Sequence, residues 1–127
     1  MTMVLRIAAI IFGLLFLIPG FVGVFRPERL AEALFLVPET DVGWVTIQVL
    51  IGAPYIAMSL VTLYGAIRGQ WALLAPVAAI EGVMALTRTF SGFTYGFEAA
   101  GIGTIIIEVV VCVILGLAAT LPARAQS

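Results

Sequence analysis

Four long apolar stretches follow one another along the chain, and each reaches the roughly 20 residues that a helix needs to cross a bilayer. They cover about residues 4–25, 44–67, 71–90 and 99–121. The stretches lack the alternation of barrel strands and are too long for strands, so helices are the predicted way to satisfy their backbone in lipid. The pattern therefore predicts an all-α protein, a four-transmembrane-helix antiparallel bundle forming a single domain.

The connections between the four stretches differ in length. Only residues 68–70 separate the second stretch from the third, which predicts a tight antiparallel hairpin. Residues 91–98, before the fourth stretch, are rich in glycine and aromatic residues. The first connection is longest, and within residues 27–37 charged positions lie opposite leucine and valine, which predicts a short interfacial helix. Trp44 and Trp71 begin spans at opposite ends, as aromatic interface anchors do.

Three charged residues lie inside the third and fourth stretches: Glu81, Arg88 and Glu108. A charge in hydrocarbon is costly unless it is paired, hydrated or neutralised, so these residues form the candidate site. Helical side chains lean toward the helix N-terminus, so Arg88 and Glu108 on antiparallel neighbours lean toward each other. The sequence predicts an Arg88–Glu108 ion pair. Glu81 is left without a cation, and we expect it to be largely protonated at neutral pH, with Tyr55 as its hydrogen-bond partner.

Other polar and small residues recur at steps of three and four, which directs them to one face of each helix. Such faces are expected to converge inside the bundle, because the lipid-facing surfaces are the apolar ones. The supporting polar stripe comprises Gln48, Tyr55, Ser59 and Thr62 in the second stretch and Thr104 in the fourth. Gly13 and Gly20 in the first stretch are predicted to let helices approach closely. For the cluster of Glu81, Arg88 and Glu108 two interpretations stay open: a site for a proton or small polar ligand, or polar contacts that only hold helices together.

Composition restricts the function further. The chain has 127 residues, 63% of them hydrophobic and 10% charged, against about a quarter charged in a soluble domain. A formal net charge of −1 and the absence of lysine argue against a nucleic-acid partner. With no histidine and one cysteine, Cys112, the sequence predicts no histidine-ligated metal site, no internal disulfide and no cofactor. The expected partners are the lipid bilayer and a second membrane protein or another copy of the chain.

The arginines suggest an orientation in the membrane. Arg6, Arg68 and Arg124 fall on one side, and Arg26 and Arg29 fall on the other. By the positive-inside rule we expect both termini to be cytoplasmic. The first stretch is longer than the apolar region of a signal peptide and lacks its small-residue cleavage pattern, so we interpret it as a retained span.

Short motifs along nearly the whole chain carry a family resemblance. They are Phe25-Arg26-Pro27-Glu28-Arg29-Leu30, Gly52 with Tyr55, Gly65-Ala66-Ile67-Arg68, Glu81-Gly82, Leu86-Thr87-Arg88 and Glu108. With these motifs the chain resembles the domain of unknown function 4345 group, an uncharacterised bacterial membrane family in the wider DoxX-like set. The chain departs from that pattern at Thr94-Tyr95-Gly96, where the family has an Asp-Gly. The resemblance implies four membrane helices in a bacterial plasma membrane and assigns no activity.

Three hypotheses about function follow. The leading one is a small integral membrane protein with a structural or accessory role, whose Arg/Glu cluster holds the bundle together. The rival is a carrier or channel for protons or a small polar solute, with Glu81 as the titrating group. A third is a membrane enzyme acting on a lipid or quinone, for which the carboxylates offer acid–base chemistry but the sequence marks no nucleophile.

Overall fold

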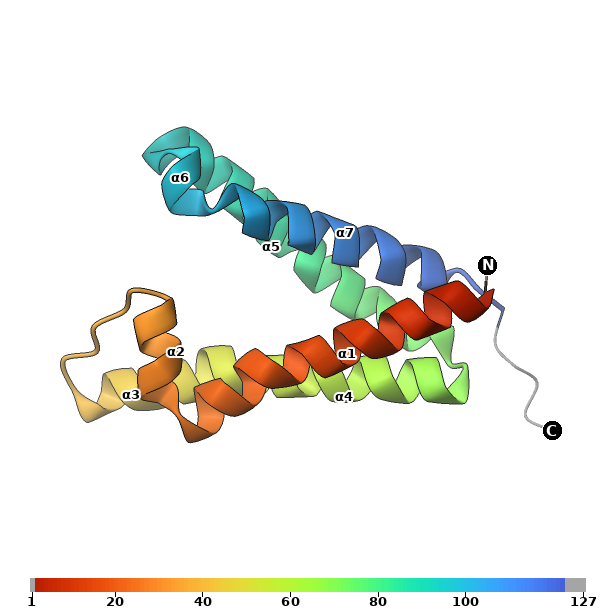
Figure 1. Cartoon of the computed structure of the whole chain (residues 1–127), viewed down its shortest axis with the longest axis horizontal. Helices are drawn as coiled ribbons and strands as arrows, with labels where there is room; N and C mark the ends of the chain where they lie inside the picture. Colours follow the sequence, from red (N-terminus) through yellow and green to blue (C-terminus); the bar gives the residue numbers. More distant parts are fainter. Residues whose placement is uncertain (1, 123–127) are drawn as a thin grey trace.

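The computed structural model describes residues 2–122, and these residues form helices and turns without any strand (Figure 1). In chain order the elements are α1 (Thr2–Phe25), α2 (Pro27–Ala33), α3 (Asp41–Ile47), the π-helical segment η1 (Gln48–Gly52), α4 (Ala53–Arg68), the 3₁₀ turn η2 (Trp71–Leu73), α5 (Leu74–Tyr95), α6 (Phe97–Ala100) and α7 (Ile102–Ala119). Four continuous rods are long and apolar enough to cross a membrane: Thr2–Phe25, Asp41–Arg68, Trp71–Tyr95 and Ile102–Ala119. The predicted all-α fold with four spans is confirmed.

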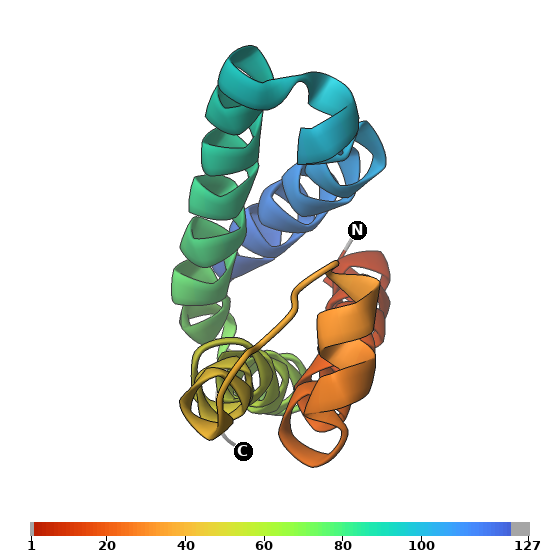
Figure 2. The ribbon, with the colours of Figure 1, turned by 90° about the vertical axis from the view of Figure 1, so that its left-hand side faces the viewer.

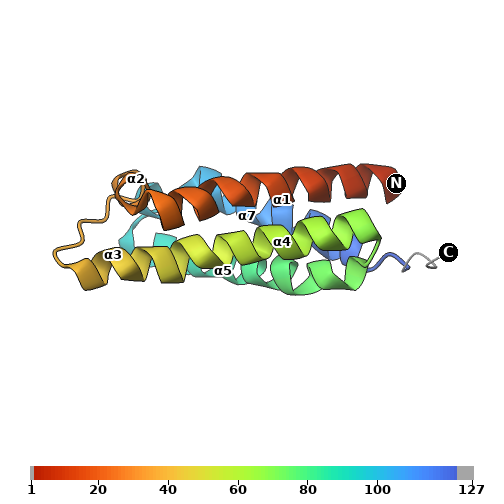
Figure 3. The same ribbon diagram turned by 90° about the horizontal axis from the view of Figure 1, so that it is seen from below.

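The four rods are arranged as two antiparallel pairs, α1 with α4 and α5 with α7 (Figures 1 and 3). The pairs meet where the chain starts and α7 ends, and they diverge toward the opposite end, where α2 and α6 lie (Figures 1 and 2). We call these the closed end and the open end. The tight turn at residues 68–70 is present, but it joins the two pairs at the closed end, because α4 packs chiefly on α1 and α5 on α7.

Glycines bring α1 and α4 unusually close. A Cβ on Gly13 or Gly20 would lie 2.7 Å from a side chain of α4, and one on Gly23 would lie 2.6 Å from the Cα of Gly52. No side chain fits in such a space, and at Gly23 and Gly52 the two backbones are in direct contact, as small residues allow in membrane helix packing. The predicted role of Gly13 and Gly20 in close helix approach is confirmed.

A hydrophobic core fills the closed end. It draws on all four rods and comprises Ala9, Phe16, Met58, Ala66, Trp71, Leu74, Val77, Ala78, Val111, Leu115 and Ala118. Trp71 is only 2% exposed, so it belongs to this core, and its predicted role as an interface anchor is wrong. Arg6 secures the same end by donating from Nη2 to the carbonyl oxygen of Ile67 at 2.8 Å, which caps the last turn of α4.

The short helix of the first connection ends earlier than its pattern predicts. It is α2, which stops at Ala33, whereas the predicted segment ran through residue 37. The N–H of Phe35 bonds to Glu32 O and that of Leu36 to Ala31 O, with Phe35 at a φ of 55°. This is the hydrogen-bond pattern of a Schellman motif, which reverses the chain and ends the helix. The polar–apolar pattern beyond residue 33 therefore belongs to a loop.

The third connection also differs in its boundaries. The helix α5 continues to Tyr95, five residues past the predicted end of its span, and α7 begins at Ile102. Gly96 and Gly101, with φ values of 95° and 77°, flank the short helix α6 and supply the turns on each side of it. Positive φ is costly for residues with a side chain, so these glycines set the limits of the connection.

Candidate functional site

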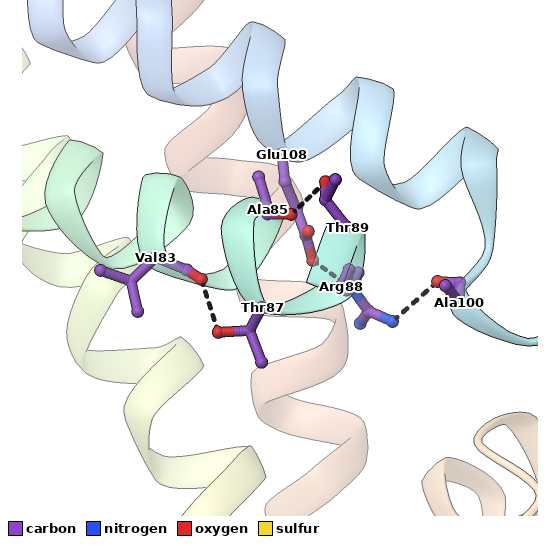
Figure 4. A network of polar contacts seen from close by, with 7 residues as sticks. All are labelled: Val83, Ala85, Thr87, Arg88, Thr89, Ala100 and Glu108. Atoms are coloured by element: carbon purple, nitrogen blue, oxygen red, sulfur yellow. Dashed lines mark hydrogen bonds and ion pairs between the residues drawn. The ribbon is translucent and has the colours of Figure 1, made fainter. Parts of the chain in front are cut away.

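The predicted ion pair is present, and it joins the antiparallel helices α5 and α7. Arg88 of α5 donates from Nε to Oε1 of Glu108 on α7 at 2.7 Å (Figure 4). The Glu108 side chain is 5% exposed and that of Arg88 is 37% exposed. The antiparallel packing of α5 on α7, with side chains that lean toward each helix N-terminus, brings the two groups together, as the sequence predicts.

Each member of the pair keeps unused hydrogen-bonding capacity. Arg88 Nη1 lies 3.5 Å from the carbonyl oxygen of Ala100, at the outer limit for a hydrogen bond (Figure 4). Its Nη2 makes no hydrogen bond with any residue between 2 and 122, and the buried Oε2 of Glu108 has no partner in that range either. The pair is therefore a single charge-assisted bond, and it leaves guanidinium donors free.

Glu81 is buried in the contact between α5 and α7, two helical turns before Arg88 on α5. Its exposed fraction is 3%, and its Oε1 has no hydrogen-bond partner among residues 2–122. The predicted hydrogen bond with Tyr55 is not formed in this part of the chain. Tyr55 instead packs against Phe16 of α1, with ring centroids 6.1 Å apart. Glu81 is thus a buried carboxyl group without the partner that we expected.

The supporting polar stripe does not converge on the charged residues as predicted. Ser59 donates to the carbonyl oxygen of Gly13 at 2.6 Å, and Gln48 donates from Nε2 to that of Val24 at 2.7 Å. Both side chains fasten α4, or the π-helical segment before it, to the backbone of α1. The close approach at the α1 glycines puts those carbonyl oxygens within reach. Thr62 is also buried, and its Oγ1 has no partner among the described residues.

Thr104 was predicted to face inward and is exposed in the structure. It lies in the first turn of α7, four residues before Glu108. Four residues turn a helix by about 400°, so Thr104 is offset by about 40° from Glu108. The offset and the position at the helix end place its hydroxyl outside the α5–α7 contact, so this part of the prediction is wrong.

A cleft that the sequence did not predict lies between the two helix pairs. Its volume is about 410 Å³, and its lining consists of Pro19, Leu30, Leu34, Leu50, Ile51, Pro54, Tyr55, Met58, Ile80, Met84 and Arg88. Tyr55 and Arg88 are the polar side chains in this lining. The spacing of Met84 to Arg88 and of Tyr55 to Met58 follows helical steps of four and three, and this was the signal available in the sequence.

The residues in and behind the cleft offer limited chemistry. Within residues 2–122, no group of three histidine, cysteine, aspartate or glutamate side chains is placed to hold a metal ion. The arrangement supplies an ion pair, a buried carboxyl group and a guanidinium that faces an apolar cleft. No family model, curated protein or solved structure matches this chain. The resemblance to the uncharacterised bacterial membrane family therefore stays a prediction.

Proposed function

We propose that this chain is a small multi-pass integral membrane protein with a structural or accessory role. The observation that supports the proposal is the Arg88–Glu108 bond of 2.7 Å between two helices that are each long and apolar enough to span a bilayer. Within hydrocarbon an unpaired charge is unfavourable, so a pair formed only when α5 and α7 are correctly aligned fixes their register. The polar contacts of Ser59 and Gln48 do the same between α1 and the rod that contains η1 and α4.

The packing of the closed end and the burial of Glu81 favour a structural role over a conduction pathway. The closed end is filled by apolar side chains from all four rods. Glu81, the residue that a proton carrier would use, is 3% exposed and is not part of the cleft lining. In an accessory role the protein would act on another membrane protein or on a second copy through its lipid-facing helices.

One observation favours a second candidate function, a carrier for protons or a small polar solute. Glu81 is a buried carboxyl group whose Oε1 lacks a hydrogen-bond partner within residues 2–122. Ionisable residues in membrane spans are frequent in proton pathways. This candidate requires Glu81 to exchange protons with water through a conformation more open than the one described above.

Proton flux in liposomes separates the two candidates. Purified protein is reconstituted with an internal pH-sensitive dye, and flux is followed after a pH step for wild type, Glu81→Gln and the control Glu98→Gln, which alters an exposed carboxylate on α6. For an accessory protein, all three samples show the flux of protein-free liposomes. Flux in the wild type and in Glu98→Gln that disappears in Glu81→Gln would refute the accessory role in favour of the carrier.

We further propose that the closed end faces the cytoplasm of a bacterial cell, with both termini on that side. Arg6 and Arg68 lie at the closed end and Arg26 and Arg29 at the open end, while Arg124 lies outside the described residues. Alkaline phosphatase is active only after export, so a fusion after residue 122 should be inactive and an insertion at Gly96 active. The opposite pattern of activities would reverse the orientation.

A further inference from the structure

The cleft between the helix pairs is lined by residues of rods that are long and apolar enough to span a bilayer. Its lining comes from α1, α2, η1, α4 and α5. Apart from α2, these elements belong to the rods of the two helix pairs, which diverge toward the open end (Figures 1 and 2). At about 410 Å³ the cleft falls within the range of ligand pockets, which is roughly 300–1,000 Å³. Because the surrounding rods are long and apolar enough to span a bilayer, hydrocarbon chains of the lipid are the molecules closest to this opening.

Two hydrogen-bond donors in the cleft lack acceptors. Within residues 2–122, Arg88 Nη2 and the hydroxyl of Tyr55 make no hydrogen bond, and both side chains line the cleft. The side chain of Glu108 is 5% exposed and that of Arg88 is 37% exposed. Arg88 lines the cleft and Glu108 does not, so the cleft meets the cationic side of the ion pair. In hydrocarbon no water is present to satisfy such donors, and a ligand with acceptor oxygens would do so.

The position of the guanidinium restricts the shape of the ligand. Arg88 is seven residues before the end of α5, which places it about 10 Å inside that end of the helix. A phospholipid keeps its phosphate at the interface, whereas a small carboxylate on a single chain has a head small enough to descend to this depth. The planar guanidinium also matches the two oxygens of a carboxylate, to which it donates parallel hydrogen bonds.

We propose that the cleft binds a long-chain carboxylate, the anion of a fatty acid. The carboxylate accepts hydrogen bonds from Arg88 and Tyr55, and the chain lies against Ile80, Met84 and Met58. Methionine suits this lining because its flexible thioether adapts to a mobile chain. This binding site goes beyond the accessory role proposed above, and neither proposal depends on the other.

Binding of radiolabelled palmitate to the detergent-solubilised full chain tests the proposal. Met84→Trp fills the cleft, and its control Val83→Trp adds the same group at a position that is 62% exposed and outside the lining. Tyr55→Phe removes one donor, and its control Tyr64→Phe removes a hydroxyl on the same helix, also outside the lining. Each variant is first checked for monodisperse elution, so that loss of binding is not loss of fold.

We expect saturable binding of palmitate. Methyl palmitate should compete at least about tenfold more weakly than unlabelled palmitate, since the ester loses the charge-assisted hydrogen bond. Met84→Trp should weaken binding by about tenfold as it occupies the cleft, and Tyr55→Phe by about fivefold for one hydrogen bond. Both controls should bind as the wild type does. Equal competition by the methyl ester, or equal affinity of Met84→Trp and Val83→Trp, would overturn the proposal. Stronger competition by phosphatidylglycerol than by unlabelled palmitate would also overturn it, because the occupant would then be a phospholipid.

Discussion

Replacing Glu108 by glutamine removes the negative charge that pairs with Arg88 while almost preserving the size of the side chain. Removing one partner of a buried ion pair costs about 3–5 kcal/mol, since the remaining charge is left uncompensated. Arg88 is 37% exposed at the cleft, so part of that cost is relieved, and we expect a loss of about 2–3 kcal/mol in the free energy of unfolding. This exceeds the roughly 0.6 kcal/mol average for a hydrogen bond between membrane helices.

Reversible titration of the protein with SDS in mixed micelles, followed by circular dichroism, measures this loss. Glu81→Gln is the matched control, because Glu81 is 3% exposed on the same helix pair and its Oε1 has no partner among residues 2–122. We expect Glu81→Gln to change the free energy of unfolding by less than about 1 kcal/mol, since no ion pair is broken. If the two variants lost equal stability, Glu81 would also be acting as a charged partner. If Glu108→Gln unfolded as the wild type does, the ion pair would not hold α5 to α7.

Two further predictions use the same titration. Gly23→Ala should destabilise the protein by about 1–3 kcal/mol through overpacking, because the added Cβ would lie 2.6 Å from the Cα of Gly52. The control Gly103→Ala has open space around it and should increase the free energy of unfolding by about 0.5–1 kcal/mol. Equal effects of the two substitutions would show that Gly23 and Gly52 are not in backbone contact. Ser59→Ala should lose about 0.5–2 kcal/mol with the hydrogen bond to the Gly13 carbonyl oxygen, and an unchanged midpoint would contradict that contact.

The number and type of the helices could be read from the sequence because membrane crossing depends on local properties. An apolar run of about 20 residues has few alternatives to a helix in lipid. The Arg88–Glu108 pair was also within reach of the sequence, since helix depth and the lean of side chains are fixed by helix geometry. The ends of the helices were harder to predict from the sequence. The Schellman motif that ends α2 places Phe35 at positive φ, which this residue type seldom adopts, so no glycine in the sequence marked the helix end.

The choice of neighbours for each rod was decided only by the tertiary structure. Each of the four rods presents small residues and apolar surface, and several pairings satisfy that pattern equally well. The contact between Gly23 and Gly52 selects α1 as the neighbour of the rod that contains η1 and α4, and it turns Ser59 and Gln48 toward the backbone of α1. Those polar residues were therefore unavailable to the charged site that the sequence assigned to them.

Hydropathy and helical geometry along the chain are sufficient to predict four helices that are long and apolar enough to span a membrane. They also predict the ion pair between Arg88 and Glu108, because the depth and lean of each side chain are set within its own helix. Three features emerge only when the helices pack: the rods form two diverging pairs, Thr104 is exposed, and Arg88 borders a cleft with Tyr55. These features depend on how closely two backbones approach and at what angle. The distance and angle between two backbones are set by many weak contacts between different rods, and no single stretch of sequence contains those contacts.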